Sequence, residues 1–358
     1  MSTLSHNGSV DLGSLRGRRL PKAVPPLLGV AALAVSAAGI LGTGAGGWVL
    51  TVVVAALLFG IGTFGVALAV EGSRKARDRL ATIAVYGAFI LALIPLGSVV
   101  ATLLAKGTGR IDAEFFYHSM NNITALDSGG GAYHAIIGTL EQVGIAAVLA
   151  IPLGLAAAVY IVEYGRGRLT AAIRFFVDVM TGIPSIVAGL FVLAFWVLIV
   201  TPVFNDGRPG YSGFAAALAL TVLMLPTIVR SAEEMLRLVP QALREGSYAL
   251  GVPKWKTIVR VVLPTAAPGI VTGVMLAIAR AAGETAPVLL VAGGTPAINF
   301  NPFSGNQESL SYFVYEQAGA ASQYSPGRAW TAALTLIAIV AILTIAAKLL
   351  ARRSTIGR

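Results

Sequence analysis

Eight long apolar runs constrain this 358-residue chain to a membrane protein built from α-helices. A transmembrane helix needs about 20 mostly apolar residues to cross roughly 30 Å of hydrocarbon. The composition agrees, because 56% of the residues are hydrophobic and only 12% are charged, well away from the averages of soluble domains. No large soluble domain fits between the runs. We predict spans near residues 24–42, 48–70, 81–105, 134–162, 181–201, 213–229, 262–293 and 328–348.

The basic residues alternate between the two sides of these spans. With the N-terminal tail placed in the cytoplasm, 21 of the 26 Lys and Arg residues fall on the cytoplasmic side. The opposite loops hold only Lys106, Arg110, Arg208 and Arg328. This asymmetry follows the positive-inside rule and predicts a multi-pass protein with both termini in the cytoplasm. The net charge of +10 therefore indicates membrane lipid, and not nucleic acid, as the partner of the basic residues.

The motifs divide the chain into four parts. Residues 1–22 form a polar cytoplasmic tail, and residues 23–80 an accessory transmembrane hairpin followed by a basic linker. Residues 81–350 contain six spans and every recognisable motif, and residues 351–358 form a second cytoplasmic tail. A cleaved signal peptide is the alternative interpretation of residues 1–42, because basic residues precede an apolar run there. That run is longer than the usual 7 to 15 residues of a signal core, which favours a retained span.

The segment Arg244–Pro264 is charged and amphipathic, and it lies between two apolar spans. Counted from Glu245, Gly251 is seventh, Leu263 nineteenth and Pro264 twentieth. This spacing resembles the cytoplasmic signature loop of ABC importer permeases, which begins Glu-Ala-Ala, has Gly at the seventh place and ends in Leu-Pro. The resemblance implies that the segment, within a loop of residues 230–260, couples the permease to cytosolic ATP-binding subunits.

The same loop departs from the family pattern where Gly246 and Ser247 replace the two alanines. Glycine costs a helix roughly 1 kcal/mol relative to alanine, so the helix is weakened but not excluded. Pro240 suits a helix start, and Gly251 followed by Pro253 suits a helix end. We therefore predict a short helix, a tight turn and a second helix that runs into the seventh span. From composition alone, a solvated amphipathic loop is the alternative.

Three further segments strengthen and narrow the resemblance. Residues 138–165 end in Tyr-Ile-Val-Glu-Tyr, residues 178–191 read DVMTGIPSIVAGLF, and residues 279–290 read ARAAGETAPVLL. Together with the signature loop they resemble the PstA family, the permease subunits of bacterial phosphate ABC importers. The resemblance implies a six-helix type I ABC importer core in the plasma (inner) membrane. It also implies three partners: a second permease subunit that completes a heterodimer, cytosolic ATP-binding subunits and an extracytoplasmic phosphate-binding protein.

Arg280 and Glu284 lie four residues apart inside an otherwise apolar span. Charged residues at membrane depth are costly and face a protein interior or an aqueous path. The planar fork of arginine suits phosphate, and Glu284 is suited to hold that fork until an anion competes for it. The alternative is a permanent ion pair that fixes helix packing. The resemblance adds Thr285 to the predicted substrate pathway, and the neighbouring Gly283 indicates an irregular helix.

The sequence contains no phosphate-binding loop of the Gly-x-x-x-x-Gly-Lys-Ser/Thr type, and it has no cysteine. Its three histidines are scattered without metal-ligand spacing. We predict a transport permease without catalytic residues, cofactor or metal, whose ATP is used by a partner subunit and whose cargo is inorganic phosphate. The alternatives are a permease for another oxyanion such as molybdate or sulfate, a gradient-driven secondary transporter, and a membrane scaffold that recruits a soluble enzyme.

Overall fold

The computed structural model describes residues 19–43 and 47–356, and within these ranges every regular element is a helix. Most of the predicted tail of residues 1–22 lies outside the described residues, as do residues 44–46 between the first two predicted spans. The chain divides into two compact units, residues 1–100 and 101–358.

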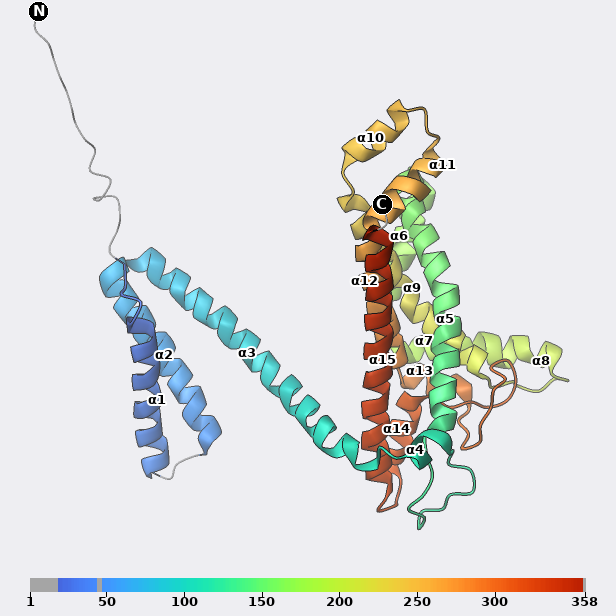
Figure 1. The fold of residues 1–358 in the computed structure, drawn as a ribbon, viewed down its shortest axis with the longest axis horizontal. Coiled ribbons are helices and arrows are strands. Elements are labelled where there is room, and N and C mark those ends of the chain that lie inside the picture. The colour runs from blue at the N-terminus through green and yellow to red at the C-terminus, as the bar shows by residue number, and fades with distance from the viewer. Residues whose placement is uncertain (1–18, 44–46, 357–358) are drawn as a thin grey trace, which may run out of the picture. The chain divides into compact units, whose positions relative to one another are not determined.

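The N-terminal unit contains α1 (Val24–Thr43), α2 (Trp48–Glu71) and the first part of α3 (Ser73–Gly107). Helices α1 and α2 pack side by side (Figure 1). Only Gly72, at a φ of +88°, separates α2 from α3, in a backbone region that glycine adopts without strain. The basic residues of the predicted linker form the first turns of α3.

The C-terminal unit is built around α9 (Gly213–Leu238), which packs against α5 (Tyr133–Val159) and α12 (Leu263–Ala282). Short π-helical segments extend the long helices at Tyr160–Tyr164, Leu193–Val200 and Ile258–Val262. The remaining elements are η1 (Thr108–Arg110), α4 (Ala113–Tyr117), α6 (Arg168–Thr181), α7 (Ser185–Val192), α8 (Thr201–Phe204), α10 (Gln241–Ala249), α11 (Lys254–Thr257), α13 (Ala286–Ala292), α14 (Leu310–Gly319) and α15 (Ser325–Ile356).

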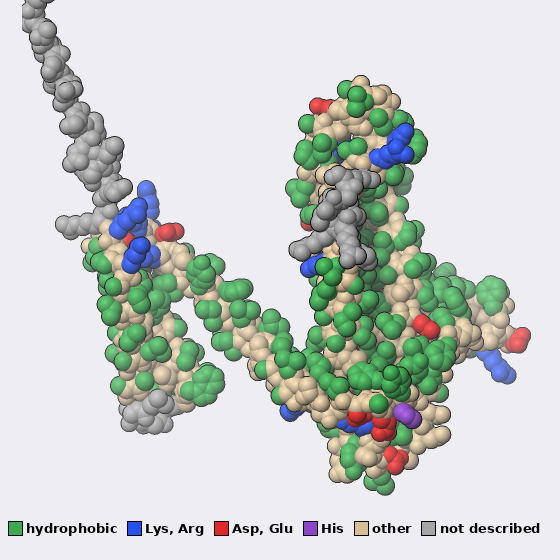
Figure 2. Space-filling model, viewed as in Figure 1, with side chains coloured by type: hydrophobic (Ala, Val, Ile, Leu, Met, Phe, Trp, Pro, Cys, Tyr) green, Lys and Arg blue, Asp and Glu red, His purple; other side chains and the backbone are tan. Residues whose placement is uncertain are grey.

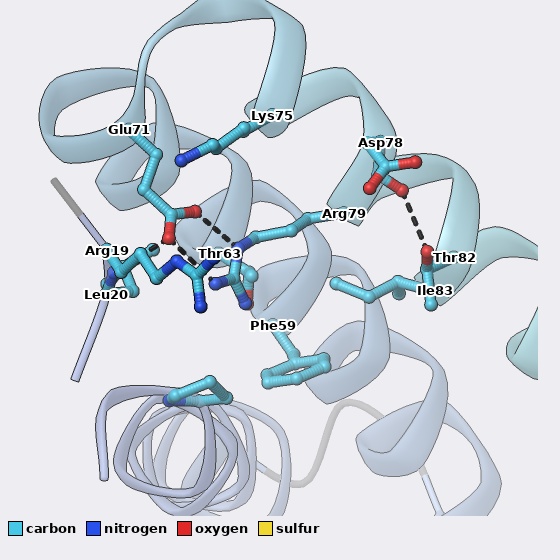
Figure 3. A pocket seen from close by; sticks show the side chains of 11 residues that line it. Arg19, Leu20, Phe59, Thr63, Glu71, Lys75, Asp78, Arg79, Thr82 and Ile83 are labelled. Atoms are coloured by element: carbon cyan, nitrogen blue, oxygen red, sulfur yellow. Dashed lines mark hydrogen bonds and ion pairs between the residues drawn. The ribbon is translucent and has the colours of Figure 1, made fainter. Parts of the chain in front are cut away.

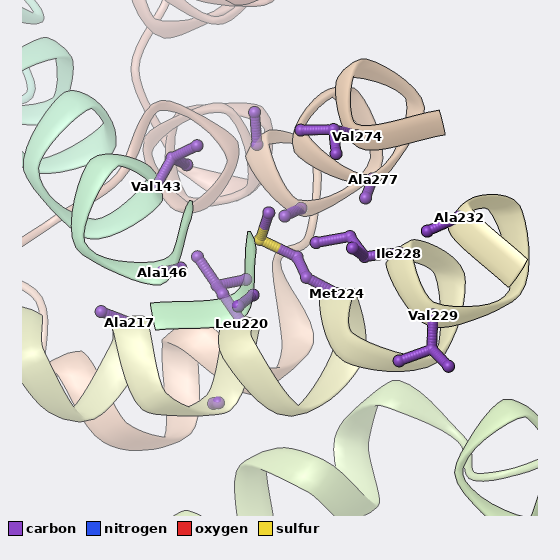
Figure 4. Packing of buried hydrophobic residues seen from close by; sticks show 14 of the residues in the cluster. Val143, Ala146, Ala217, Leu220, Met224, Ile228, Val229, Ala232, Val274 and Ala277 are labelled. Carbon is purple, nitrogen blue, oxygen red and sulfur yellow. The ribbon is translucent and has the colours of Figure 1, made fainter. Parts of the chain in front are cut away.

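Small side chains let the helices of this core approach one another closely. Figure 4 shows Leu220, Met224 and Ile228 of α9 packed between α5 and α12. The start of α9 carries four fully buried alanines, Ala215, Ala216, Ala217 and Ala219. Small residues at such contacts are typical of membrane helix packing, where close backbone approach replaces hydrophobic collapse as the source of stability.

Seven helices in the described residues are long and apolar enough to cross a membrane. They coincide with seven of the eight predicted spans, and the first predicted span coincides with α1, of which the shorter stretch Val24–Ile40 is apolar. The span predicted at 262–293 is irregular, as Gly283 indicated: it consists of two helices, α12 and α13, because the chain leaves the helix at Gly283. The continuous helical stretch begins earlier, at Lys254.

Candidate functional site: a surface helix pair and a charged helix break

Helices α10 and α11 form the predicted helix-turn-helix at one end of the C-terminal unit (Figure 1). Gly251 has a φ of +73°, the left-handed conformation that ends a helix and that side chains strain. Its N–H donates to the carbonyl of Tyr248 at 2.9 Å, and Val252 N–H donates to Ser247 at 3.3 Å. The predicted tight turn is confirmed, and α11 continues through a π-helical segment into α12.

A buried arginine anchors this helix pair to the end of α5. Arg244 is 8% exposed, and its Nε and Nη2 donate to Oε1 of Glu163 at 3.0 and 2.8 Å. It also donates to the carbonyls of Val239 at 2.7 Å and Leu236 at 2.9 Å. Sequence reasoning treated Arg244 only as a cytoplasmic basic residue. A signal was present, since Arg244 precedes the signature and Glu163 closes the Tyr-Ile-Val-Glu-Tyr motif.

Two further contacts stiffen the pair. The hydroxyl of Ser247 lies 2.8 Å from that of Thr257, which joins α10 to the end of α11. The Lys254 ammonium donates to the carbonyl of Glu163 and lies 4.8 Å from the centroid of the Tyr164 ring, within the range of a cation–π contact. The serine that departs from the family pattern thus supplies a hydrogen bond that alanine cannot make.

The outward surface of the helix pair is open. Glu245 is exposed, and so are two large apolar side chains, Leu250 at 84% and Trp255 at 62%. Leu263 and Pro264 lie deeper, half-buried at the start of α12. Large apolar side chains that stand exposed beside a charge are typical of a protein contact surface. The four residues predicted for coupling therefore occupy two levels, with Glu245 and Gly251 at the surface and Leu263 and Pro264 at the join to the core.

The second candidate region is the break between α12 and α13. Arg280 stands in the last turn of α12, and Glu284 follows the helix end, so they do not share one regular helix as the spacing suggested. Their side chains still meet, with Nε of Arg280 3.6 Å from Oε1 of Glu284. Arg280 is 62% exposed and Glu284 is 18% exposed. A charge this open at the end of a membrane span requires water or another chain beside it.

Helix α14 supports the break from one side. The hydroxyl of Ser311 donates to the carbonyl of Glu284 at 2.8 Å, and the hydroxyl of Thr285 donates to the carbonyl of Ser311 at 3.4 Å. A Cβ on Gly189 of α7 would lie 2.7 Å from Cα of Pro287, so only glycine permits this approach of α7 to α13. These contacts fix the backbone from Glu284 into α13, whereas the Arg280 side chain remains largely exposed.

Glu141 lies in a polar cluster around Gln307. Gln307 is 1% exposed, and its amide donates to the Glu141 carboxylate and to the carbonyl of Asn299 at 3.1 Å. Gln142 donates to Oε1 of Gln307 at 3.1 Å. This amide seats the loop between α13 and α14 against α5. The cluster satisfies polar groups that would be costly if left unpaired at this depth.

Comparison with known proteins identifies the family to which this chain belongs. The family described as "Binding-protein-dependent transport system inner membrane component" matches residues 150–356. A chain of the crystal structure of a bacterial alginate ABC transporter, in complex with a periplasmic protein, aligns over 78% of this chain and 96% of its own, with a TM-score of 0.54 at 15% identity. The MetNI methionine ABC transporter aligns over 62% of this chain and 94% of its own, with a TM-score of 0.50 at 22% identity. Fold and sequence together define an ABC importer permease.

Relatives of known sequence narrow the family further. "Phosphate transport system permease protein PstA 1" of Mycobacterium tuberculosis is 49% identical over 77% of this chain and 89% of its own length. The PstA protein of Mycobacterium leprae is 46% identical over 75% and 86%, and that of Pasteurella multocida is 34% identical over 77% and 95%. The chain belongs to the PstA family of phosphate transport system permeases.

This membership confirms the predicted class of protein. The chain is an all-helical, multi-pass inner-membrane protein with the permease fold of ABC importers. It acts as the permease subunit of a phosphate ABC transporter and is not itself the ATPase, so ATP is hydrolysed by a partner subunit. A binding protein is the other partner that membership implies.

Proposed function

We propose that this permease translocates inorganic phosphate along a path lined by Arg280, Glu284 and Thr285. The observation that carries the proposal is the 62% exposure of Arg280 at the end of a membrane span, with a single carboxylate 3.6 Å away. A pair this long and this open is not a closed structural salt bridge. The guanidinium offers several N–H donors in one plane, and phosphate accepts two of them side by side.

The exposed face of α10 and α11 is proposed to dock on the ATP-binding subunits. Glu245 would contact the ATPase directly, and Gly251 would hold the turn that presents it. Leu263 and Pro264 would pass the movement into α12, whose far end carries Arg280. A second permease subunit would cover the open side of Arg280, so the substrate path would form between the two permeases of a heterodimer.

The proposed orientation places α10 and α11, the tail of residues 1–22 and the tail of residues 351–358 in the cytoplasm. It rests on the concentration of basic residues on that side and on the positive-inside rule. In this organisation residues 23–80 are an accessory segment and residues 81–350 the permease domain. A reporter fused after Arg358 is expected to respond as a cytoplasmic protein, and an extracytoplasmic response would contradict the orientation.

The substrate path is tested by uptake of labelled phosphate into vesicles that contain the complete transporter and ATP. Arg280→Lys keeps the positive charge but loses the planar fork, so we expect uptake to fall about tenfold or more while the complex assembles normally. Glu284→Gln is expected to impair uptake as well, because it leaves the arginine unpaired. Molybdate and sulfate serve as competitors, and a cargo other than phosphate would show itself by stronger competition.

Arg208→Lys is the matched control, because Arg208 is exposed in a loop outside the helix break. It is expected to transport at the unmodified rate. The alternative of a purely structural ion pair predicts that both single variants misassemble and that the variant with Arg280→Met and Glu284→Leu recovers. Unmodified uptake by that double variant would overturn the assignment of Arg280 to the path.

A further inference from the structure

The N-terminal unit contains a pocket of about 570 Å³ where α2 ends and α3 begins. Figure 3 shows it lined by side chains from both helices and from the segment that precedes α1. Three of its lining residues are basic, namely Arg19, Lys75 and Arg79. In Figure 2 blue side chains gather at this end of the N-terminal unit. The family match begins only at residue 150, so it assigns no role to this pocket.

A buried carboxylate holds one of the three cations in place. Glu71, whose side chain is 2% exposed, accepts from Arg79 Nε at 2.6 Å and Nη2 at 2.9 Å. It also accepts from the backbone N–H of Leu20 at 2.7 Å, which fixes the segment that carries Arg19. The Arg79 side chain remains 35% exposed and lines the pocket. Glu71 therefore orders the basic wall, and Arg19 and Lys75 add positive charge beside it, so that the three cations outnumber the two carboxylates of the lining, Glu71 and Asp78.

The lining is apolar on the side of Phe59 (Figure 3), and Leu20, Pro25 and Ile83 add further apolar surface. Between the two walls lies Thr63, which is 4% exposed and whose hydroxyl has no hydrogen-bond partner within the described structure. Buried polar groups are almost always hydrogen-bonded. An unpaired hydroxyl in the lining of a basic pocket therefore indicates a ligand with an acceptor oxygen.

We propose that this pocket binds the phosphate-bearing headgroup of an anionic phospholipid. Its position at the end of the apolar helix α2 corresponds to the depth of lipid headgroups. Basic pockets between membrane helices are suited to anionic headgroups. Free phosphate would satisfy the cations and the Thr63 hydroxyl, but it would gain nothing from the Phe59 wall. A lipid uses both walls, with its phosphate on the basic side and its glycerol and upper acyl carbons on the apolar side.

The test is binding of fluorescent phosphatidylglycerol to the purified full-length chain in a neutral detergent. The variant carrying Arg19→Ala and Lys75→Ala removes two cations and leaves the Glu71–Arg79 pair intact. Each basic residue near a lipid headgroup contributes about fivefold in affinity, so we expect binding to weaken about 25-fold. Lys75→Arg keeps the charge and is expected to retain binding. Fluorescent phosphatidylcholine is expected to bind much more weakly than phosphatidylglycerol.

The matched control carries Arg74→Ala and Arg77→Ala, two exposed cations of the same helix that do not line the pocket. It is expected to change binding less than about twofold. Equal losses in the two double variants would overturn the site, because they would indicate only general charge attraction. Equal binding of the two lipids would overturn it as well. Displacement of the lipid by millimolar inorganic phosphate would refute a lipid site and indicate a phosphate site.

Discussion

Removing Arg244 is expected to release the helix pair α10–α11 from the end of α5. The pair Arg244–Glu163 is buried, with side-chain exposures of 9% and 5%. The substitution Arg244→Met leaves the Glu163 carboxylate without its cation and removes the side-chain donor of the Val239 and Leu236 carbonyls, of which Leu236 keeps the Val239 N–H. Breaking a buried pair in this way costs about 3–5 kcal/mol. The equilibrium between the anchored and the released helix pair is thus expected to shift by roughly a hundredfold or more.

The assay is amide hydrogen exchange over residues 241–257 in the purified transporter, with phosphate uptake measured on the same preparation. Local opening raises exchange in proportion to the population of the open state, so exchange over α10 and α11 should rise while α9 stays protected. Uptake should fall because a released pair cannot transmit movement. The double variant with Arg244→Met and Glu163→Leu removes both charges, and such replacements often restore stability. It is expected to recover most of the protection.

The control is Arg237→Met. Arg237 is 55% exposed and pairs with Glu233, which keeps a second partner in Arg174 at 3.2 Å. Exposed pairs contribute about 0–1 kcal/mol, so little change is expected. Unchanged exchange over residues 241–257 in Arg244→Met would refute the reasoning, because it would mean that other contacts hold the helix pair without this arginine.

Two further predictions concern the turn and the outer loop. Gly251→Val places a β-branched side chain at a φ of +73°, which costs about 1–3 kcal/mol, so ATP-driven uptake should fall. The control Gly246→Val changes a helical position and should be tolerated better. Normal uptake in Gly251→Val would contradict a role in coupling. Burial, and secondarily Glu316, raises the pKa of Glu308 from 4.5 to about 9; because the folded chain keeps a proton that the unfolded chain loses, stability should fall as pH rises through this interval. In Glu308→Gln the thermal midpoint of unfolding should depend less on pH. A pH profile identical to that of the unmodified chain would show that Glu308 does not titrate in this way. The group to test next would be His134, whose Nε2 lies 3.3 Å from Oε2 of Glu308.

The local features of this protein follow from short stretches of sequence. Apolar runs of about 20 residues predict the spans because the hydrocarbon thickness sets their length. Gly251 and Pro253 predict the turn after α10 because their backbone preferences are local. Gly283 likewise indicates that the seventh span is not one regular helix. The segment from Glu245 to Pro264 predicts the class of protein through its resemblance to the signature loop of ABC importer permeases, because that loop lies within twenty residues.

The partners of the charged and polar groups depend on tertiary structure. Arg244 meets Glu163 across 81 positions, and Gln142 meets Gln307 across 165. The pairing of Arg280 with Glu284 was predicted from spacing, but its exposure depends on how α12 packs in the unit and where it ends. Sequence alone determined which segments are helices and where the chain turns, because those preferences act over a few residues. Which buried charges pair with each other depends on the packing of the helices, because packing brings residues distant in sequence close together in space. Pairing is required because a charge buried without a partner is strongly destabilising.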